Sequence, residues 1–175
     1  MAIWFTVDDC TSSLVRQLHQ YWASKRGDRR LPRRADVDPG EIKDLLPYIL
    51  IADLVGELPR VRYRLVGTKV AAASGIELTG HYLDEFVAGD VENEWQDYYG
   101  RVRDDARPLF GNATVPRLDG ELFRYEFGLF PLTTSGTAVG QCIAIEDYFE
   151  MNDRMYELRD KTQPWHLRPI RPKTT

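Results

Sequence analysis

The sequence contains little cysteine and no long apolar run. Its two cysteines, Cys10 and Cys142, are too few for a disulfide scaffold or for a four-cysteine zinc site. No segment approaches the ~20 consecutive apolar residues of a membrane span. The first residues have no basic leader before an apolar run, which excludes a secretory signal. We therefore expect a cytoplasmic protein that does not engage membranes and that carries two free thiols.

The composition predicts one folded domain. Of the 175 residues, 43% are apolar, which is enough for a hydrophobic core, and the length suits a single domain. The formal net charge of −4 argues against a surface that wraps nucleic acid. We expect residues 1–175 to form one domain with three parts: a helical cap and basic loop at 11–46, a core at 47–148 and a tail at 149–175.

The first part of the sequence predicts two helices. A stripe of apolar residues spaced at helical intervals predicts a helix over residues 12–26, which Gly27 would end. The apolar residues of this stripe are Leu14, Val15, Leu18 and Trp22. Asp38 suits the start of a short second helix that ends before Pro47.

The rest of the sequence predicts five strands with helices between them. Residues 48–55 are nearly all apolar, which is typical of a strand covered on both faces, and residues 60–66 alternate like its hairpin partner. A short helix at 68–74 and a long helix at 90–105 follow. Three further strands are predicted at 108–116, 121–132 and 137–148. This order predicts an α+β fold: a five-stranded antiparallel sheet with 48–55 inside it, helices on one face and the N-terminal helix on the other.

This order of elements resembles the PAS fold. Three segments are also similar to a PAS subfamily known mainly from alphaproteobacteria, and they read YWASKRGDRRLPRRADVDPGEIKDLLPYILIADLV, RVRYRLVGT and SGIELTGHYLDEF. The resemblance covers roughly residues 20–150, and its most specific parts are RLPRRADVDP and YRLVGT. It implies a signalling protein that senses a small ligand or contacts a partner protein, without bringing a known ligand with it.

The sequence offers no residue set for the cofactors that some PAS domains carry. Haem-binding PAS domains usually ligate iron through a histidine on or near the long helix, and residues 90–105 contain none. We interpret His81, just ahead of this helix, as a hydrogen-bonded structural residue. Neither cysteine stands in the Asn-Cys-Arg-Phe-Leu type of motif found in flavin photoreceptors, and no acidic cluster has calcium or zinc spacing. We therefore expect no haem, no flavin and no metal, and a colourless protein.

Four arginines of the basic loop, Arg29, Arg30, Arg33 and Arg34, leave two interpretations open. Their Arg-x-x-x-Arg spacing is similar to the first half of the cyclic-dinucleotide motif of PilZ domains, and guanidinium groups bind phosphate bidentately. This favours a receptor for a phosphorylated nucleotide, but the second half of that motif is absent. The simpler interpretation, which we favour, is a solvated loop whose arginines pair with acidic neighbours.

Three carboxylates fall within predicted strands: Asp53, Glu126 and Glu146. Asp53 and Glu146 would be neighbours if the first and last strands pair, and a carboxylate facing an apolar cavity would have a raised pKa and could move protons. A small proton-transfer enzyme is therefore an alternative. Ion pairs with arginines explain these carboxylates more simply and no catalytic motif accompanies them, so we expect no enzymatic activity.

We interpret the chain as a sensory PAS module that has no output domain of its own and signals through a partner protein. A ligand between the sheet and the long helix would change how the first helix packs. The residues expected to line this site are Tyr63, Leu65, His81, Trp95, Phe127 and Ile143. The stripe on residues 12–26 is wider than one contact needs, so we also expect a homodimer through this helix. The ligand, the partner and the direction of the signal do not follow from the sequence.

Overall fold

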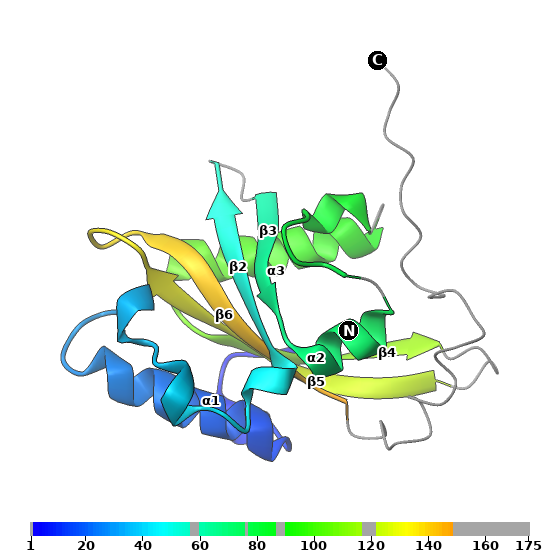
Figure 1. Ribbon diagram of the computed structural model, residues 1–175, viewed down its shortest axis with the longest axis horizontal. Helices are drawn as coiled ribbons and strands as arrows, with labels where there is room; N and C mark the ends of the chain where they lie inside the picture. Colours follow the sequence, from blue (N-terminus) through cyan, green and yellow to red (C-terminus); the bar gives the residue numbers. More distant parts are fainter. Residues whose placement is uncertain (1, 57–59, 76, 87–89, 117–121, 149–175) are drawn as a thin grey trace.

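The computed structural model contains one antiparallel sheet of six strands. The strands are β1 (Ala2–Trp4), β2 (Ile49–Val55), β3 (Arg60–Val66), β4 (Leu109–Pro116), β5 (Leu122–Thr133) and β6 (Val139–Asp147). They lie in the order β1-β4-β5-β6-β2-β3 (Figure 1). The structure describes residues 2–56, 60–75, 77–86, 90–116 and 122–148, so the predicted tail at 149–175 lies outside the described residues.

The predicted strand at 48–55 is confirmed as an interior strand of the sheet. Strand β2 is hydrogen-bonded to β3 on one side and to β6 on the other, and its residues Ile49–Ala52 are buried on both faces. The prediction of five strands was wrong by one, because β1 adds a sixth strand to the edge of β4 through the pairs Ala2–Asn112 and Trp4–Phe110. A strand of three residues is too short to show a period-two pattern, so it could not be predicted from hydrophobic periodicity.

Helices cover both faces of the sheet. Helix α1 (Ser13–Arg26) lies on one face, and helices α2 (Thr68–Ser74) and α3 (Asp90–Asp105) lie on the other (Figure 1). The side chain of Ser12 caps α1 by accepting a hydrogen bond from the Val15 backbone N–H at 3.1 Å. The short helix predicted from Asp38 was wrong: Asp38 caps only the single 3-10 turn Pro39–Glu41, and a second such turn follows at Leu46–Tyr48.

Alternate residues of β5 face the two helical layers. The ring of Phe127 lies 5.0 Å from Trp95 and 6.2 Å from Tyr98 of α3, measured between centroids. The ring of Phe130 lies 6.2 Å from Trp22 of α1. Because side chains alternate along a strand, odd-numbered β5 residues in this stretch face α3 and even-numbered residues face α1.

Two glycines let large rings pack against the sheet. A Cβ on Gly128 would lie 2.8 Å from the Phe130 ring and 3.2 Å from a methyl group of Val15. A Cβ on Gly111 would lie 2.6 Å from the backbone oxygen of Ala2 and 2.7 Å from the Phe127 ring. The two faces therefore use the same arrangement, a glycine beneath a phenylalanine.

The homodimer predicted through residues 12–26 stays a prediction, but its physical basis changes. Val15, Leu18 and Trp22 are buried within the chain. Most of the apolar stripe therefore packs against the sheet of the same chain. Leu14 is half-buried and is the stripe residue that keeps part of its surface for another contact.

The two cysteines are buried free thiols. Burial raises the pKa of Cys10 to about 12 and raises that of Cys142 in β6 as well. No helix in the described ranges is long and apolar enough to cross a membrane.

Candidate functional site

An aromatic layer lies between α3 and the sheet. Its members come from β3, α3, β5 and the residue after β6, and we call them the aromatic layer: Tyr63, Trp95, Tyr98, Tyr99, Tyr125, Phe127 and Tyr148. Tyr125 joins the two ends of this layer, because its ring lies 6.3 Å from Phe127 and 5.0 Å from Tyr148. Trp95 is half-buried, so the layer reaches the surface at this residue.

Glu146 places one carboxyl group against the aromatic layer. It lies opposite Phe127 in the β5–β6 ladder, so both side chains face α3. The carboxylate accepts a hydrogen bond from the Tyr148 hydroxyl, and it has no ion-pair partner in the part of the chain that the structure describes. Burial raises the pKa of Glu146 to about 7, and the Tyr148 hydrogen bond only partly opposes this effect.

The tyrosines around Glu146 remain neutral at physiological pH. Burial raises the pKa of Tyr99, Tyr125 and Tyr148 well above the ordinary tyrosine value, and the nearby Glu146 carboxylate adds to the effect. The site therefore combines neutral phenols with one carboxyl group that is able to gain or lose a proton near pH 7. Such a set offers hydrogen-bond donors, acceptors and apolar ring surface to a ligand.

The structure brings three of the six predicted lining residues to this layer: Tyr63, Trp95 and Phe127. Tyr63 is buried and lies near enough to Tyr99 to contribute to the raised pKa of that residue. Whether these residues contact a ligand stays a prediction.

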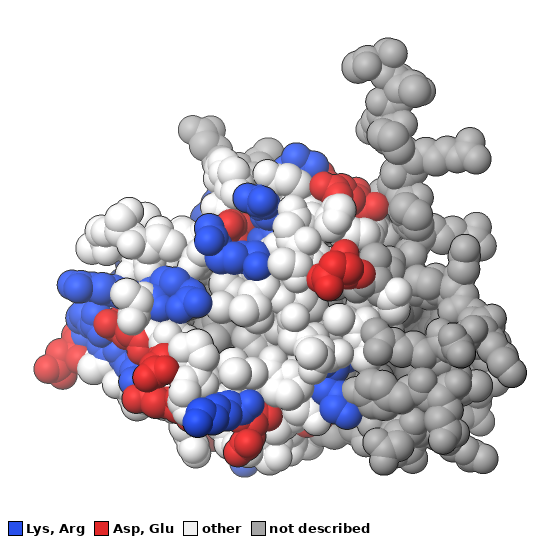
Figure 2. Space-filling view, viewed as in Figure 1, with Lys and Arg blue, Asp and Glu red and all other residues white. Residues whose placement is uncertain are grey.

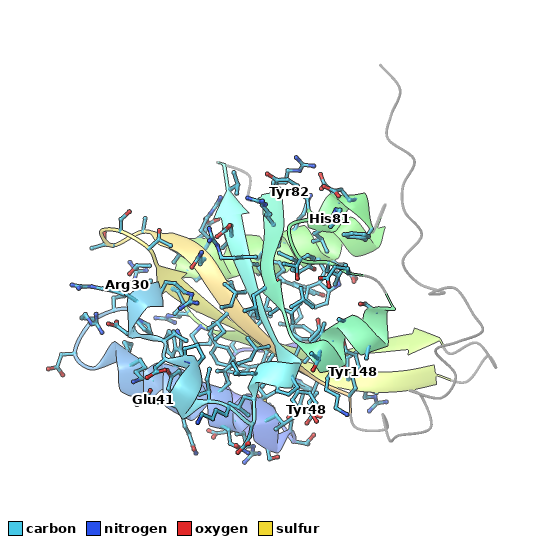
Figure 3. The ribbon with its side chains drawn as sticks, viewed as in Figure 1. Arg30, Glu41, Tyr48, His81, Tyr82 and Tyr148 are labelled. Atoms are coloured by element: carbon cyan, nitrogen blue, oxygen red, sulfur yellow. The ribbon has the colours of Figure 1, made fainter. Side chains whose placement is uncertain are left out.

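The other three predicted lining residues lie elsewhere. Ile143 pairs with Phe130 across the ladder and therefore faces α1, and Leu65 lies on the same face and is 39% exposed. The backbone carbonyl of His81 accepts a hydrogen bond from the Tyr63 N–H at 2.9 Å, but its side chain lies at the surface (Figure 3). Its ring is 52% exposed and bonds the Glu85 carboxylate at 2.7 Å. These three expectations were wrong in placement because a sequence pattern does not give strand register or the course of a loop.

The predicted neighbourhood of Asp53 and Glu146 does not form. Strands β2 and β6 do pair, but the antiparallel register places Asp53 opposite Gln141, at the far end from Glu146. Asp53 accepts hydrogen bonds from Gln141 Nε2 at 2.6 Å and from Arg64 Nε at 3.2 Å. This carboxylate therefore has the arginine pairing that the simpler interpretation expected.

Glu126 anchors the start of α1. Its two carboxylate oxygens accept hydrogen bonds from the Thr11 N–H at 3.0 Å, the Thr11 hydroxyl at 2.9 Å and the Ser12 N–H at 2.8 Å. The residue is 2% exposed and faces α1. Its role is to satisfy backbone donors ahead of the helix. A sequence pattern could not assign this partner, which lies 114 residues away from Ser12.

The side chains of three of the four loop arginines have different hydrogen-bond partners. Arg29 pairs with Asp36 at 2.7 Å, whereas Arg30 donates to the backbone carbonyl of Asp105 in α3 at 3.2 Å. Arg34 donates to the Val37 carbonyl at 3.4 Å. Figure 2 shows basic and acidic side chains interspersed over α1 and the loop that follows it.

No group of three or more His, Cys, Asp or Glu side chains in the described ranges is arranged to hold a metal ion.

Comparison with known families agrees with this architecture. The model of the PAS domain family matches residues 10–143, and the chain belongs to this family. No curated protein matches the sequence.

Several solved structures are similar to this chain. An RNA-binding light-oxygen-voltage receptor has 18% identity and a TM-score of 0.45, with 70% of this chain and 34% of that chain covered. A LOV protein of Rhodobacter sphaeroides has 14% identity and a TM-score of 0.47, with coverages of 65% and 67%. The PAS domain of a protein from Colwellia psychrerythraea has 14% identity and a TM-score of 0.45, with coverages of 65% and 98%. The chain thus spans about a third of the first of these proteins, and at TM-scores below 0.5 these likenesses carry no argument about function.

Proposed function

We propose that this PAS domain is a signalling module that binds a small organic ligand in the aromatic layer and passes the change to a partner protein. The observation that carries the proposal is Glu146, a half-buried carboxyl group that faces the layer without an ion-pair partner among the described residues. A polar group kept in such a place costs folding energy, which a ligand contact would offset.

The chemistry of the layer limits the ligand class. Aromatic rings favour a planar or aliphatic body, and Glu146 with the Tyr148 hydroxyl favours a ligand that carries a hydrogen-bond donor or an amine. A carboxylate or phosphate on the ligand would meet Glu146 and be repelled whenever this carboxyl group is ionised.

The sheet offers a short route from the ligand to α1. Phe127 contacts Trp95 of α3, and the next residue, Gly128, lies directly beneath Val15 of α1. A ligand that moves Phe127 would therefore change the surface on which α1 rests. The two arrangements of α1 would be the signalling states, and the ligand would shift the balance between them.

Mass spectrometry under non-denaturing conditions tests this proposal on protein purified from native cells. We expect a co-purifying molecule that is retained by wild-type protein and by Ile143→Val, which changes the opposite face of the same strand. We expect Glu146→Gln to lose it. Recovery from all three proteins alike, or from none, would contradict the proposed site.

Proton-transfer catalysis is the second candidate, because the pKa of Glu146 is about 7. Glu146 would have to act alone, since Asp53 is held at the other end of the ladder. The recovered molecule, incubated with the protein in deuterated water, separates the two candidates. Deuterium uptake that requires Glu146 would indicate an enzyme, and an unchanged molecule would indicate a receptor.

A further inference from the structure

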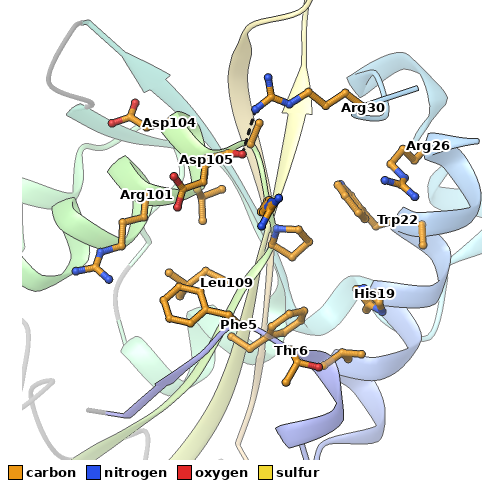
Figure 4. Close-up of a pocket in the computed structure, with 17 residues that line it drawn as sticks. Phe5, Thr6, His19, Trp22, Arg26, Arg30, Arg101, Asp104, Asp105 and Leu109 are labelled. Carbon is orange, nitrogen blue, oxygen red and sulfur yellow. Dashed lines mark hydrogen bonds between the residues drawn. The ribbon is translucent and has the colours of Figure 1, made fainter. Parts of the chain in front are cut away.

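A groove lined by residues other than those of the aromatic layer lies beside the C-terminal end of α3. It has a volume of about 990 Å³ and lies between α1, the segment after β1 and the end of α3. Figure 4 shows Trp22 pointing into it from α1, and Phe5 and Leu109 at its lower end. This volume is at the upper end of the range for sites that hold drug-sized molecules. We call it the α1–α3 groove.

Aromatic side chains form one wall of the α1–α3 groove. The ring of His19 lies 6.5 Å from Trp22 in a stacked arrangement and 5.7 Å from Phe110 edge-on. Burial lowers the pKa of His19, so its ring is neutral at physiological pH and adds aromatic surface rather than charge. Phe5 is 68% exposed although it is a large apolar side chain at the groove, so it is free to cover a ligand.

The rim of the groove carries more positive than negative charge. Arg26, Arg30 and Arg107 line it without a carboxylate partner in the part of the chain that the structure describes. Arg30 donates one N–H to the Asp105 carbonyl (Figure 4). Its other guanidinium N–H groups have no hydrogen-bond partner among the described residues. Arg101, in contrast, points away from the groove and pairs with Asp97 at 2.8 Å.

The carboxylates near the rim do not cancel this charge. Asp104 also lines the groove but pairs with Arg103 at 2.8 Å. Of the remaining charged residues that line the groove, three are arginines and one, Asp105, is acidic, which leaves a local excess of about two positive charges. In a chain with a net charge of −4, such an excess beside aromatic rings selects for an anion.

We propose that the α1–α3 groove binds an aromatic anion, meaning a planar ring system that carries a carboxylate, sulfonate or phosphate group. The ring would lie between Phe5 and the wall formed by Trp22, and the acidic group would meet the guanidinium groups of Arg26 and Arg30. Stacking and bidentate hydrogen bonds are the two interactions for which these residue types are suited. The site goes beyond the proposed function, since it takes the opposite ligand charge from the aromatic layer and uses other residues.

An occupied groove would link two helices that lie on opposite faces of the sheet. The Arg30–Asp105 hydrogen bond is the direct link that spans the groove in the structure, and an anion between Arg26 and Arg30 would add to it. The basic loop would then bind an anion through Arg30 and its neighbour on α1, and not through the Arg29–Arg33 spacing seen in the sequence.

Two probes that differ only in charge test this proposal. One is 8-anilinonaphthalene-1-sulfonate, and the other is N-phenyl-1-naphthylamine, which has the same rings without the sulfonate. Titrations followed by fluorescence compare their affinities for wild-type protein and for Arg26→Gln/Arg30→Gln. The matched control is Arg33→Gln/Arg124→Gln, which removes the same charge at positions that do not line the groove. Amide NMR shifts of residues 19–26 and 104–110 locate the bound probe.

We expect wild-type protein to bind the sulfonate about tenfold more tightly than the neutral probe, and Arg26→Gln/Arg30→Gln to remove this preference. The affinity of this variant for the neutral probe should change by less than about twofold, since the rings remain. Equal affinity of wild-type protein for the two probes would overturn the proposal. An equal loss of sulfonate binding in the control variant, or NMR shifts away from the groove, would overturn it as well. Failure of this test leaves the aromatic layer untouched, because neither variant changes Glu146 or its neighbours.

Discussion

Two carboxylates on adjacent strands of the same sheet have opposite surroundings. Glu126 of β5 faces α1 and accepts three hydrogen bonds from Thr11 and Ser12. Glu146 of β6 faces α3 and accepts one, from Tyr148. Both oxygens of the Glu126 carboxylate are hydrogen-bonded to the chain ahead of α1. Glu146 lies beside tyrosine side chains, and its pKa is raised to about 7.

This difference separates a structural carboxylate from one that remains available for chemistry. A buried acid that accepts several backbone N–H groups stabilises the folded state in its charged form. A buried acid without enough donors is destabilised in its charged form, so its proton affinity rises. On the α1 face, the carboxylate of Glu126 is bonded to the segment that leads into the helix. On the α3 face, the carboxyl group of Glu146 retains oxygen lone pairs that could accept further hydrogen bonds.

The largest expected effect comes from removing the structural carboxylate. Glu126→Ala leaves the backbone donors of Thr11 and Ser12 without acceptors, so we expect the free energy of unfolding to fall by about 3 kcal/mol. Urea denaturation followed by circular dichroism measures this change. Glu126→Gln keeps one oxygen acceptor and should lie between Ala and wild type. A loss below about 1 kcal/mol for the alanine variant would show that these hydrogen bonds contribute little.

The next effect separates the two faces through their glycines. Gly128→Ala places a methyl group against Phe130 and Val15, so we expect α1 to be pushed from the sheet at a cost of about 1–3 kcal/mol. Limited proteolysis should then cut near residues 24–30 sooner than in wild type. Gly111→Ala, which meets Phe127 on the α3 face and the backbone oxygen of Ala2 in β1, is the comparison and should lower stability without increasing that cleavage. Equal cleavage in both variants would mean that the faces do not act separately.

Glu146→Gln should increase stability in a pH-dependent way. The folded-state pKa of about 7 lies above the ordinary value of 4.5, so the folded protein binds the proton more tightly than the unfolded chain does. Stability therefore falls as pH rises from about 4.5 to about 7, and the penalty is complete above that. Because the side chain is half-buried, we expect the variant to gain about 1–2 kcal/mol at pH 8 and almost nothing at pH 4.5. Urea unfolding of both proteins at several pH values measures this, and a constant difference would contradict the assignment.

The smallest effect concerns Asp53 of β2, the third of the carboxylates that the sequence analysis singled out. Its partner Arg64 is largely exposed, so we expect Arg64→Gln to cost about 0.5 kcal/mol or less. This loss should shrink further in about 1 M salt, since screening weakens exposed ion pairs. Chemical denaturation at low and high salt is the measurement. A loss above about 1 kcal/mol would place Asp53 with Glu126 as a structural carboxylate.

The sequence predicted the elements of the fold better than the site. Hydrophobic periodicity located α1, α3 and five of the strands, because each buries one face or both. The YRLVGT segment has a physical reason as well: a Cβ on Gly67 would lie 2.4 Å from the carbonyl oxygens of Leu46 and Pro47. This close approach favours glycine at that position.

The site was predicted only in part, because register and ladder partners are long-range properties. Trp95 and Phe127 were found from stripes that point to the core. Ile143 was assigned to the wrong face of the sheet. The alternation of side chains along a strand does not show which set of alternate residues faces α1 and which faces α3. Tyr99 was missed because a three-residue step from Trp95 leads to Tyr98 and passes over Tyr99, which the structure buries as well.

The two buried thiols turn the protein into a reporter of its own unfolding. With the pKa of Cys10 raised to about 12 and that of Cys142 raised as well, almost no thiolate is present at pH 7, and neither sulfur is accessible to a reagent. A maleimide dye would therefore label each cysteine only when the surrounding segment opens. Since Cys10 precedes α1 and Cys142 lies in β6, the order in which the two sites become labelled would show whether the N-terminal helix detaches before the sheet comes apart.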